Sequence, residues 1–181
     1  VTPLGTGFAG QNGLGRDVGG VYFSTRTNLL GATPFSLTSI APHTGSATTL
    51  YPGVDLRALS VGPGGALYGI KELSAGDQLV QIDMWNGAIT PIGSTGFLEV
   101  EGLAQHQGAL YAWDLTAGLL ILDQLTGAAI DPFPGIGGPA GLKTLCSHQD
   151  GRLLVGGGTS TNSLFSVDVT TGTTTLIGVM T

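Results

Sequence analysis

The feature that most constrains the fold of this chain is an internal repeat of about 43 residues. At four places along the chain, a glycine and the residue before it are followed by a short apolar stretch, as in the segment from Gly64 to Tyr68. The glycines are Gly20, Gly65, Gly108 and Gly151, so successive copies are 45, 43 and 43 residues apart. A fixed period of this length indicates similar supersecondary units, each of which buries its apolar face against the next.

A second motif, apolar-Asp-x-x-(Thr/Asn)-Gly, follows the first in three of the four copies. Such a sequence is typical of a turn, in which glycine adopts a positive φ and the Asp carboxylate accepts hydrogen bonds from nearby backbone N–H groups. The corresponding stretch of the first copy, from Ile40 to Gly45, lacks the Asp. We therefore expect a structural rather than a metal-binding role for six residues: Asp83, Gly87, Asp123, Gly127, Asp168 and Gly172.

Each repeat contains four short apolar or β-branched stretches, and no segment keeps a helical period of 3.6 residues. Four short strands per repeat are typical of a β-propeller blade. We predict an all-β fold, a β-propeller with four blades of four antiparallel strands, as a single domain over residues 1–181. The blades are expected at about 10–54, 55–97, 98–138 and 139–181, with the apolar stretches 109–113 and 119–122 as inner strands.

The chain opens with one outer-strand sequence too many, because its first residues closely mirror the segment from Thr90 to Phe97. This segment, expected at residues 1–9, could add to its own ring, add to a sheet edge of a neighbouring subunit, or begin a slice of a longer propeller. The candidate assembly strand consists of Thr2, Pro3, Leu4, Gly5, Thr6, Gly7 and Phe8.

Composition excludes some partners. Charged residues make up only 10% of the chain, against roughly 25% in a typical soluble domain. The six Lys and Arg residues are scattered, so no basic stripe is available for nucleic acid. No apolar run is long enough to span a membrane. An uncharged exterior rich in Gly, Thr and Ser suits a secreted protein whose surface is partly covered by other copies of itself.

Three residues in turns near the ends of strands are the candidates for ligand contacts. Trp85 lies in a turn and could form a platform for a sugar ring, although packing is the more common role of an aromatic residue. His106 and His148 precede the anchor glycines of successive blades and could converge near the axis, although polar loop positions are the favoured explanation for both. No motif of a nucleophile, a phosphate loop or a metal site is present, so we expect no catalytic residue, cofactor or metal.

The segments 79–93 and 164–178 resemble the blades of secreted bacterial β-propellers with the pattern Leu-x-x-Ile-Asp-x-x-Thr-Gly-x-x-Thr-x-Ile-Gly. The resemblance covers about three and a half blades and concerns architecture. It implies a scaffold or binding platform, and in some cases a lyase or oxidase framework.

These observations lead to two expectations about function. The first is a non-enzymatic extracellular structural protein that self-assembles into filaments, tubes or layers by strand addition between subunits. The alternative is a lectin-like propeller that binds a carbohydrate or another ligand.

Overall fold

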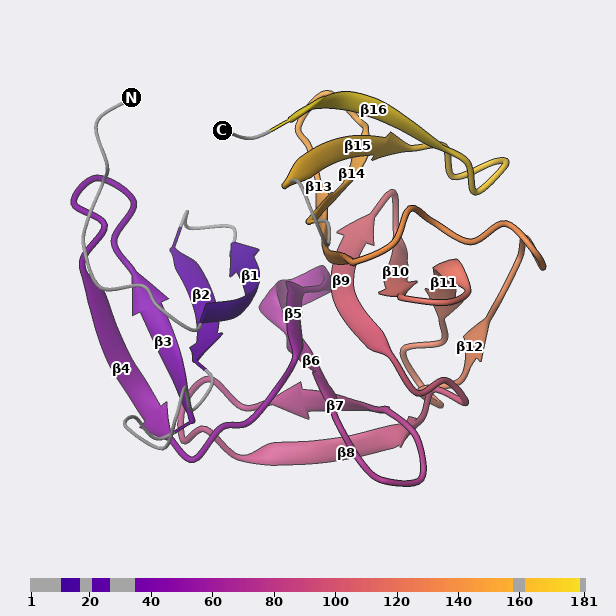
Figure 1. Ribbon diagram of the computed structural model, residues 1–181. Coiled ribbons are helices and arrows are strands. Elements are labelled where there is room, and N and C mark those ends of the chain that lie inside the picture. Colours follow the sequence, from indigo (N-terminus) through magenta and orange to yellow (C-terminus); the bar gives the residue numbers. More distant parts are fainter. Residues whose placement is uncertain (1–10, 17–20, 27–34, 158–161, 180–181) are drawn as a thin grey trace.

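The computed structural model describes residues 11–16, 21–26, 35–157 and 162–179, which form four antiparallel sheets of four strands each. The sheets are arranged around one axis as the blades of a β-propeller (Figure 1). The predicted all-β fold with four blades of four strands is therefore confirmed. The candidate assembly strand, Thr2 to Phe8, lies outside the described residues.

The strands of each blade follow one another in chain order across its sheet. Blade 1 contains β1 (Gln11–Arg16), β2 (Tyr22–Arg26), β3 (Ser36–Ile40) and β4 (Ala47–Pro52). Blade 2 contains β5 (Ala58–Val61), β6 (Leu67–Lys71), β7 (Gln78–Ile82) and β8 (Ile89–Ser94), with a 3-10 turn η2 (Pro63–Gly65) after β5. Blade 3 contains β9 (Val100–His106), β10 (Ala109–Asp114), β11 (Gly118–Leu122) and β12 (Ala129–Ile130). Blade 4 contains β13 (Leu142–Ser147), β14 (Leu153–Gly157), β15 (Ser163–Val167) and β16 (Thr174–Val179).

The innermost strands are the ones that precede the anchor glycines. β1 packs against β5, β5 against β9, and β9 against β13, whereas β13 and β1 form no comparable contact among the described residues. The apolar stretches 109–113 and 119–122, expected as inner strands, lie in β10 and β11, the two middle strands of blade 3. They are apolar because neighbouring blades cover both faces of the sheet.

Three apolar cores join consecutive blades. One leucine of each repeat lies four positions before the repeated Asp, or before Ala41 in blade 1. In blades 1 to 3 this leucine lies in the core that its blade shares with the next one. These leucines are Leu37, Leu79 and Leu119, and each is almost fully buried. Their counterpart in blade 4 is Leu164, which is only half-buried. No fourth core joins blades 4 and 1 within the part of the chain that the structure describes.

The repeated turn of each blade packs on the outer region of the preceding blade. A Cβ atom on Gly127 would lie 2.5 Å from the carbonyl oxygen of Gly93 in β8. Gly87 contacts Tyr51 of β4 in the same way, and the Tyr51 hydroxyl donates a hydrogen bond of 2.6 Å to the Met84 carbonyl. Glycine is needed at these turns both for its positive φ and because other atoms approach it closely, the Gly93 backbone at Gly127 and the Tyr51 side chain at Gly87.

The carboxylates of the repeated turns accept backbone hydrogen bonds. Asp83 Oδ1 accepts from Trp85 N, Asp123 Oδ1 from Leu125 N, and Asp168 Oδ1 from Thr170 N, at 2.7–2.8 Å. These hydrogen bonds favour the ionised form of the carboxylate and lower the pKa of Asp123. The pKa of Asp168 is also lowered, because its carboxylate accepts a further hydrogen bond from the Thr170 hydroxyl.

Among the described residues no helix is both long and apolar enough to cross a membrane.

Candidate functional site

The main candidate site is a cavity of about 400 Å³ on the propeller axis, at the ends of the innermost strands. Each of the four blades contributes to its wall. The lining residues are Gly15, Arg16, Tyr22, Ser60, Val61, Leu103, Ala104, Gln105, Leu145, Cys146, Ser147, His148 and Gln149. We call this cavity the axial pocket. Its volume is in the range of roughly 300–1,000 Å³ that is usual for small-molecule sites.

Arg16 gives the axial pocket its positive charge. Its guanidinium lies 5.8 Å from the centre of the Tyr22 ring, a cation–π contact, and it forms no ion pair with any described residue. No Asp or Glu is among the lining residues, although the whole chain has 12 acidic and only 6 basic residues. The axial pocket is therefore a local exception to the negative charge of the protein.

Gln105 supplies an unsatisfied donor in the wall of the same pocket. Its Oε1 accepts a hydrogen bond of 3.0 Å from Gln124 Nε2, which fixes the orientation of the amide. Its Nε2 is buried and has no hydrogen-bond partner. The Gln105 backbone N–H donates to Ser60 Oγ over 2.9 Å and so ties β9 to β5. A buried amide donor without a partner costs free energy, and a polar ligand would recover it.

Blade 4 contributes Ser147, Cys146 and His148. Ser147 Oγ lies 2.9 Å from Nδ1 of the buried His106, so that this pair links the ends of β9 and β13. The thiol of Cys146 reaches the surface in the pocket wall, yet the surrounding protein desolvates it and raises its pKa. His148 is partly exposed, and its Nδ1 lies 2.7 Å from Asp150 Oδ1.

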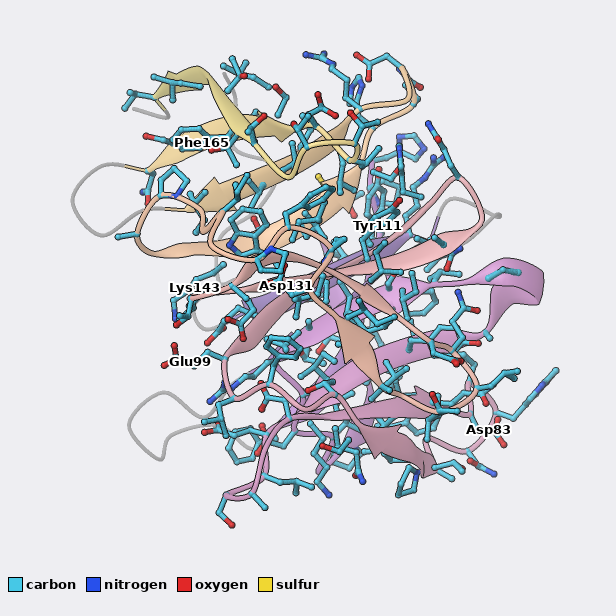
Figure 2. All side chains as sticks on the ribbon, turned by 90° about the vertical axis from the view of Figure 1, so that its right-hand side faces the viewer. Asp83, Glu99, Tyr111, Asp131, Lys143 and Phe165 are labelled. Carbon is cyan, nitrogen blue, oxygen red and sulfur yellow. The ribbon has the colours of Figure 1, made fainter. Side chains whose placement is uncertain are left out.

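The opposite end of the molecule has a different electrostatic character. Figure 2 labels Glu99 and Lys143 at one end and Asp83 at the other. At the Lys143 end, the Arg57 guanidinium binds Glu72 with two contacts of 2.5 and 3.0 Å. It also lies 3.7 Å from Asp77 and from Glu101, and Lys143 is 3.7 Å from the same Glu101 oxygen. Here the carboxylates already surround the cations.

Asp77 is the buried member of this charge network. Its side chain has no exposed surface, its Oδ2 accepts a hydrogen bond of 2.7 Å from Val100 N, and its Oδ1 has no partner. Burial raises the pKa of Asp77 to about 6, while the Val100 hydrogen bond and Arg57 oppose the rise. The Asp77 N–H also donates to the Phe97 carbonyl, so this residue fixes the segment that leads from blade 2 into blade 3.

A second cavity of about 380 Å³ lies next to this network and is lined by segments 96–99 and 114–117. Its polar groups are already used. The Asp114 carboxylate accepts hydrogen bonds from the N–H groups of Thr116, Ala117 and Glu99, at 2.8–3.3 Å. The axial pocket, with a cation and a donor that have no polar partner in the part of the chain that the structure describes, is therefore the stronger candidate.

The predicted ligand residues are distributed unevenly with respect to the axial pocket. His148 lines it, and His106 lies directly behind the wall as the partner of Ser147. Trp85 lines neither cavity described above and is 94% exposed in the outer turn of blade 2. The two imidazoles bind different partners, and no group of three or more potential metal ligands occurs within the described ranges.

Sequence reasoning missed Arg16 and Gln105. Both lie three or four positions before an anchor glycine, as do Ser147 and His148. Only their position is recognisable from the repeat, because the strand before the anchor is the innermost one and its last residues lie near the axis.

Comparison with known proteins gives the fold and no family. No protein-family model matches the chain, and no curated protein matches it. Similar solved structures include TolB from Acinetobacter baumannii, with a TM-score of 0.62 and 11% identity over 94% of this chain and 44% of that one. The PQQ-bound aldose sugar dehydrogenase from Streptomyces coelicolor has a TM-score of 0.61 and 18% identity, over 93% of this chain and 63% of that one. A gluconolactonase from Xanthomonas campestris has a TM-score of 0.56 and 17% identity, over 91% and 60%.

Two conclusions follow from these likenesses. The chain spans between 29% and 63% of the length of the similar solved structures. The prediction that the protein is not an enzyme is wrong as an exclusion, because propellers of this shape include a dehydrogenase and a lactonase. At these identities the likeness concerns the fold alone, and it gives no support to self-assembly into filaments.

Proposed function

We propose that this protein binds a small organic anion, a carboxylate that also carries hydroxyl groups, in the axial pocket. The observation that carries the proposal is Arg16, a cation that has no carboxylate partner among the described residues, in a pocket wall to which these residues contribute no Asp or Glu. An arginine guanidinium presents paired N–H donors that match the two oxygens of a carboxylate.

The remaining polar groups of the pocket suit the hydroxyl groups of such a ligand. Ser60 Oγ accepts from Gln105 N, so its hydroxyl hydrogen is available to a ligand acceptor. Gln105 Nε2 is buried, so a ligand reaches this donor only when neighbouring side chains move aside. Leu103 and Leu145 supply apolar surface between these polar groups. A few convergent polar groups on an apolar wall are typical of a small-molecule site.

Two neighbours support a carbohydrate-derived ligand, because they are named for an aldose sugar and for gluconolactone. The proposal includes export of the protein from the cytoplasm, which we expect from its sparse charge. It is supported by the presence of TolB and an auxiliary nutrient binding protein among the similar structures. The lectin-like alternative centred on Trp85 is less favoured, since that side chain protrudes alone from the outer turn of blade 2.

The first prediction compares gluconate with glucose, which have similar size and hydroxyl groups but differ in charge. Gluconate is expected to raise the unfolding temperature of the protein and to slow alkylation of Cys146, whereas glucose does neither. Arg16→Gln should weaken gluconate binding by roughly tenfold or more, because it removes a charge-assisted hydrogen bond worth about 1.5–3 kcal/mol. Thermal shift, calorimetric titration and thiol labelling measure these effects.

Arg152→Gln is the matched control, because Arg152 is an exposed arginine that pairs with Asp150 and does not line the axial pocket. Its gluconate affinity should equal that of the unmodified protein. Equal weakening by both substitutions would mean that general charge, and not the axial pocket, attracts the anion. If neither gluconate, malate nor citrate binds, the proposal of an organic-anion site is wrong.

A further inference from the structure

β16, the outer strand of blade 4, lacks the features that protect the other outer strands from pairing with another chain. β4 ends in Pro52, β8 contains Pro91, and β12 is two residues long and is followed by Asp131 and Pro132. β16 is a six-residue edge strand with neither proline nor charge. Natural sheets block exposed edges with prolines, charges or short strands, so β16 is the unprotected edge of this propeller.

β16 also exposes three apolar side chains: the equivalents of one of them are covered in blades 1 and 2, and those of the other two are exposed there but are Pro, Ser or Thr. Each long outer strand has one residue that a register shift leaves without an opposite partner: Leu50 in β4, Ile92 in β8 and Ile177 in β16. Leu50 and Ile92 pack against the cores that join their blades to the next. Ile177 is 46% exposed, and Leu176 and Val179 beside it are 55% and 53% exposed. We call Leu176, Ile177 and Val179 the β16 patch.

The space next to Gly178 supports the same interpretation. Its equivalent in blade 2, Gly93, is in close contact with the Thr126 carbonyl of the following blade, whereas a Cβ atom on Gly178 would meet nothing within 4 Å. Leu164 on the adjacent strand is half-buried, unlike its fully buried equivalents in the other blades. Within the described part of the chain, blade 4 therefore has a face and an edge that no other blade covers.

We propose that a second copy of this chain covers the β16 patch, with the two β16 strands paired antiparallel across a two-fold axis. Two four-stranded blades would then form one continuous sheet, which extends the antiparallel ladder that already joins β15 to β16. A second β16 is the occupant that matches this edge, because it has the same length, no charge and the same apolar side chains. A two-fold contact of this kind is self-complementary and closed.

The chain itself supplies the variant that tests this pairing. Pro91 of β8 lies opposite Val80 of β7. Leu176 of β16 lies opposite Phe165 of β15, and it occupies the same register position in blade 4 as Pro91 does in blade 2. Proline is tolerated in blade 2, so the N–H at this position is not needed within the sheet and points to the free edge. Leu176→Pro should keep the fold and remove a donor that the second copy needs.

The second prediction concerns self-association, measured by sedimentation velocity over a concentration series of the full chain. The unmodified protein should form a dimer, and Leu176→Pro should weaken dimerisation by at least about tenfold, since a backbone hydrogen bond and apolar contacts are lost. Thr49→Pro is the matched control, because Thr49 occupies the same register position in β4. It should leave the dimer unchanged. Val179→Lys, at an already exposed position, repeats the test without proline.

Three results would overturn the proposal. The first is an unmodified protein that stays monomeric at every concentration. The second is equal weakening by Thr49→Pro and Leu176→Pro, which would indicate a general effect of proline on the fold. The third is loss of the dimer on deletion of residues 1–8, because the N-terminal segment, and not a second β16, would then be the strand that covers the edge.

Discussion

Gly93→Ala is expected to destabilise the protein by about 3 kcal/mol, although it adds a single methyl group. The added Cβ atom would collide with the Thr126 carbonyl oxygen of the next blade, and Gly127 is equally close to the Gly93 backbone. Neither chain segment can move away easily. The turn of Asp123 is held by a hydrogen bond of 2.8 Å from Gly127 N to the Asp123 carbonyl and by the bonds to the Asp123 carboxylate. Chemical denaturation gives the free energy of unfolding.

Gly178→Ala is the matched control for this prediction, because Gly178 occupies the same position in β16. It should change the free energy of unfolding by less than about 0.5 kcal/mol, since the added Cβ atom meets nothing within 4 Å. Measurements at low protein concentration keep self-association from contributing. If both substitutions cost the same, the loss reflects the conformational preference of glycine in an outer strand, and the proposed packing of turn on blade is wrong.

Arg57→Met is expected to cost about 3 kcal/mol at pH 8 and clearly less at pH 5, because it leaves Asp77 buried without its cation. Arg57 is mostly buried and also binds Glu72 and Glu101. Methionine retains much of the aliphatic volume, so the loss reports on charge more than on packing. The free energy of unfolding of both proteins, measured by denaturant titration between pH 5 and 8, gives the difference at each pH.

The direction of this pH dependence follows from the raised pKa of Asp77, about 6 in the folded protein. A carboxyl group whose pKa is raised on folding binds its proton more tightly in the folded state, so protonation stabilises the fold. That contribution is complete below the ordinary pKa of an aspartate and is lost as the pH rises through about 6. Arg57 lowers the pKa of Asp77, so its removal raises this pKa further and enlarges the loss at high pH.

The double variant Arg57→Met, Asp77→Asn provides the control. An asparagine can still accept the Val100 N–H, and it has no charge to bury. The difference in unfolding free energy between pH 5 and pH 8 should then approach that of an Asp77→Asn single variant. A pH-dependent loss that persists in the double variant would assign the effect to Glu72 or Glu101 instead.

The site could be predicted only in part. The two histidines before the anchor glycines lie at the end of the molecule that holds the axial pocket, and His148 lines it. Arg16 escaped notice because nothing in its local sequence distinguishes a cation at the axis from one on the rim. Its significance depends on the absence of Asp and Glu among the described residues that line the pocket at the ends of three other inner strands, which are distant in sequence. Such an absence can be seen only after the strands have been brought together.

The sequence by itself determined the blade. A repeat near 43 residues, with a turn motif and four short strands, defines a unit that buries its faces only by stacking against similar units. These are local and periodic properties, which a sequence records directly. Tertiary structure decided which strand of each unit faces the axis and which glycines contact another backbone. It also decided which of four equivalent outer strands stays uncovered. The physical reason is that burial of Gly93 and exposure of Gly178 depend on the neighbouring blade, and not on the residues beside them in the chain.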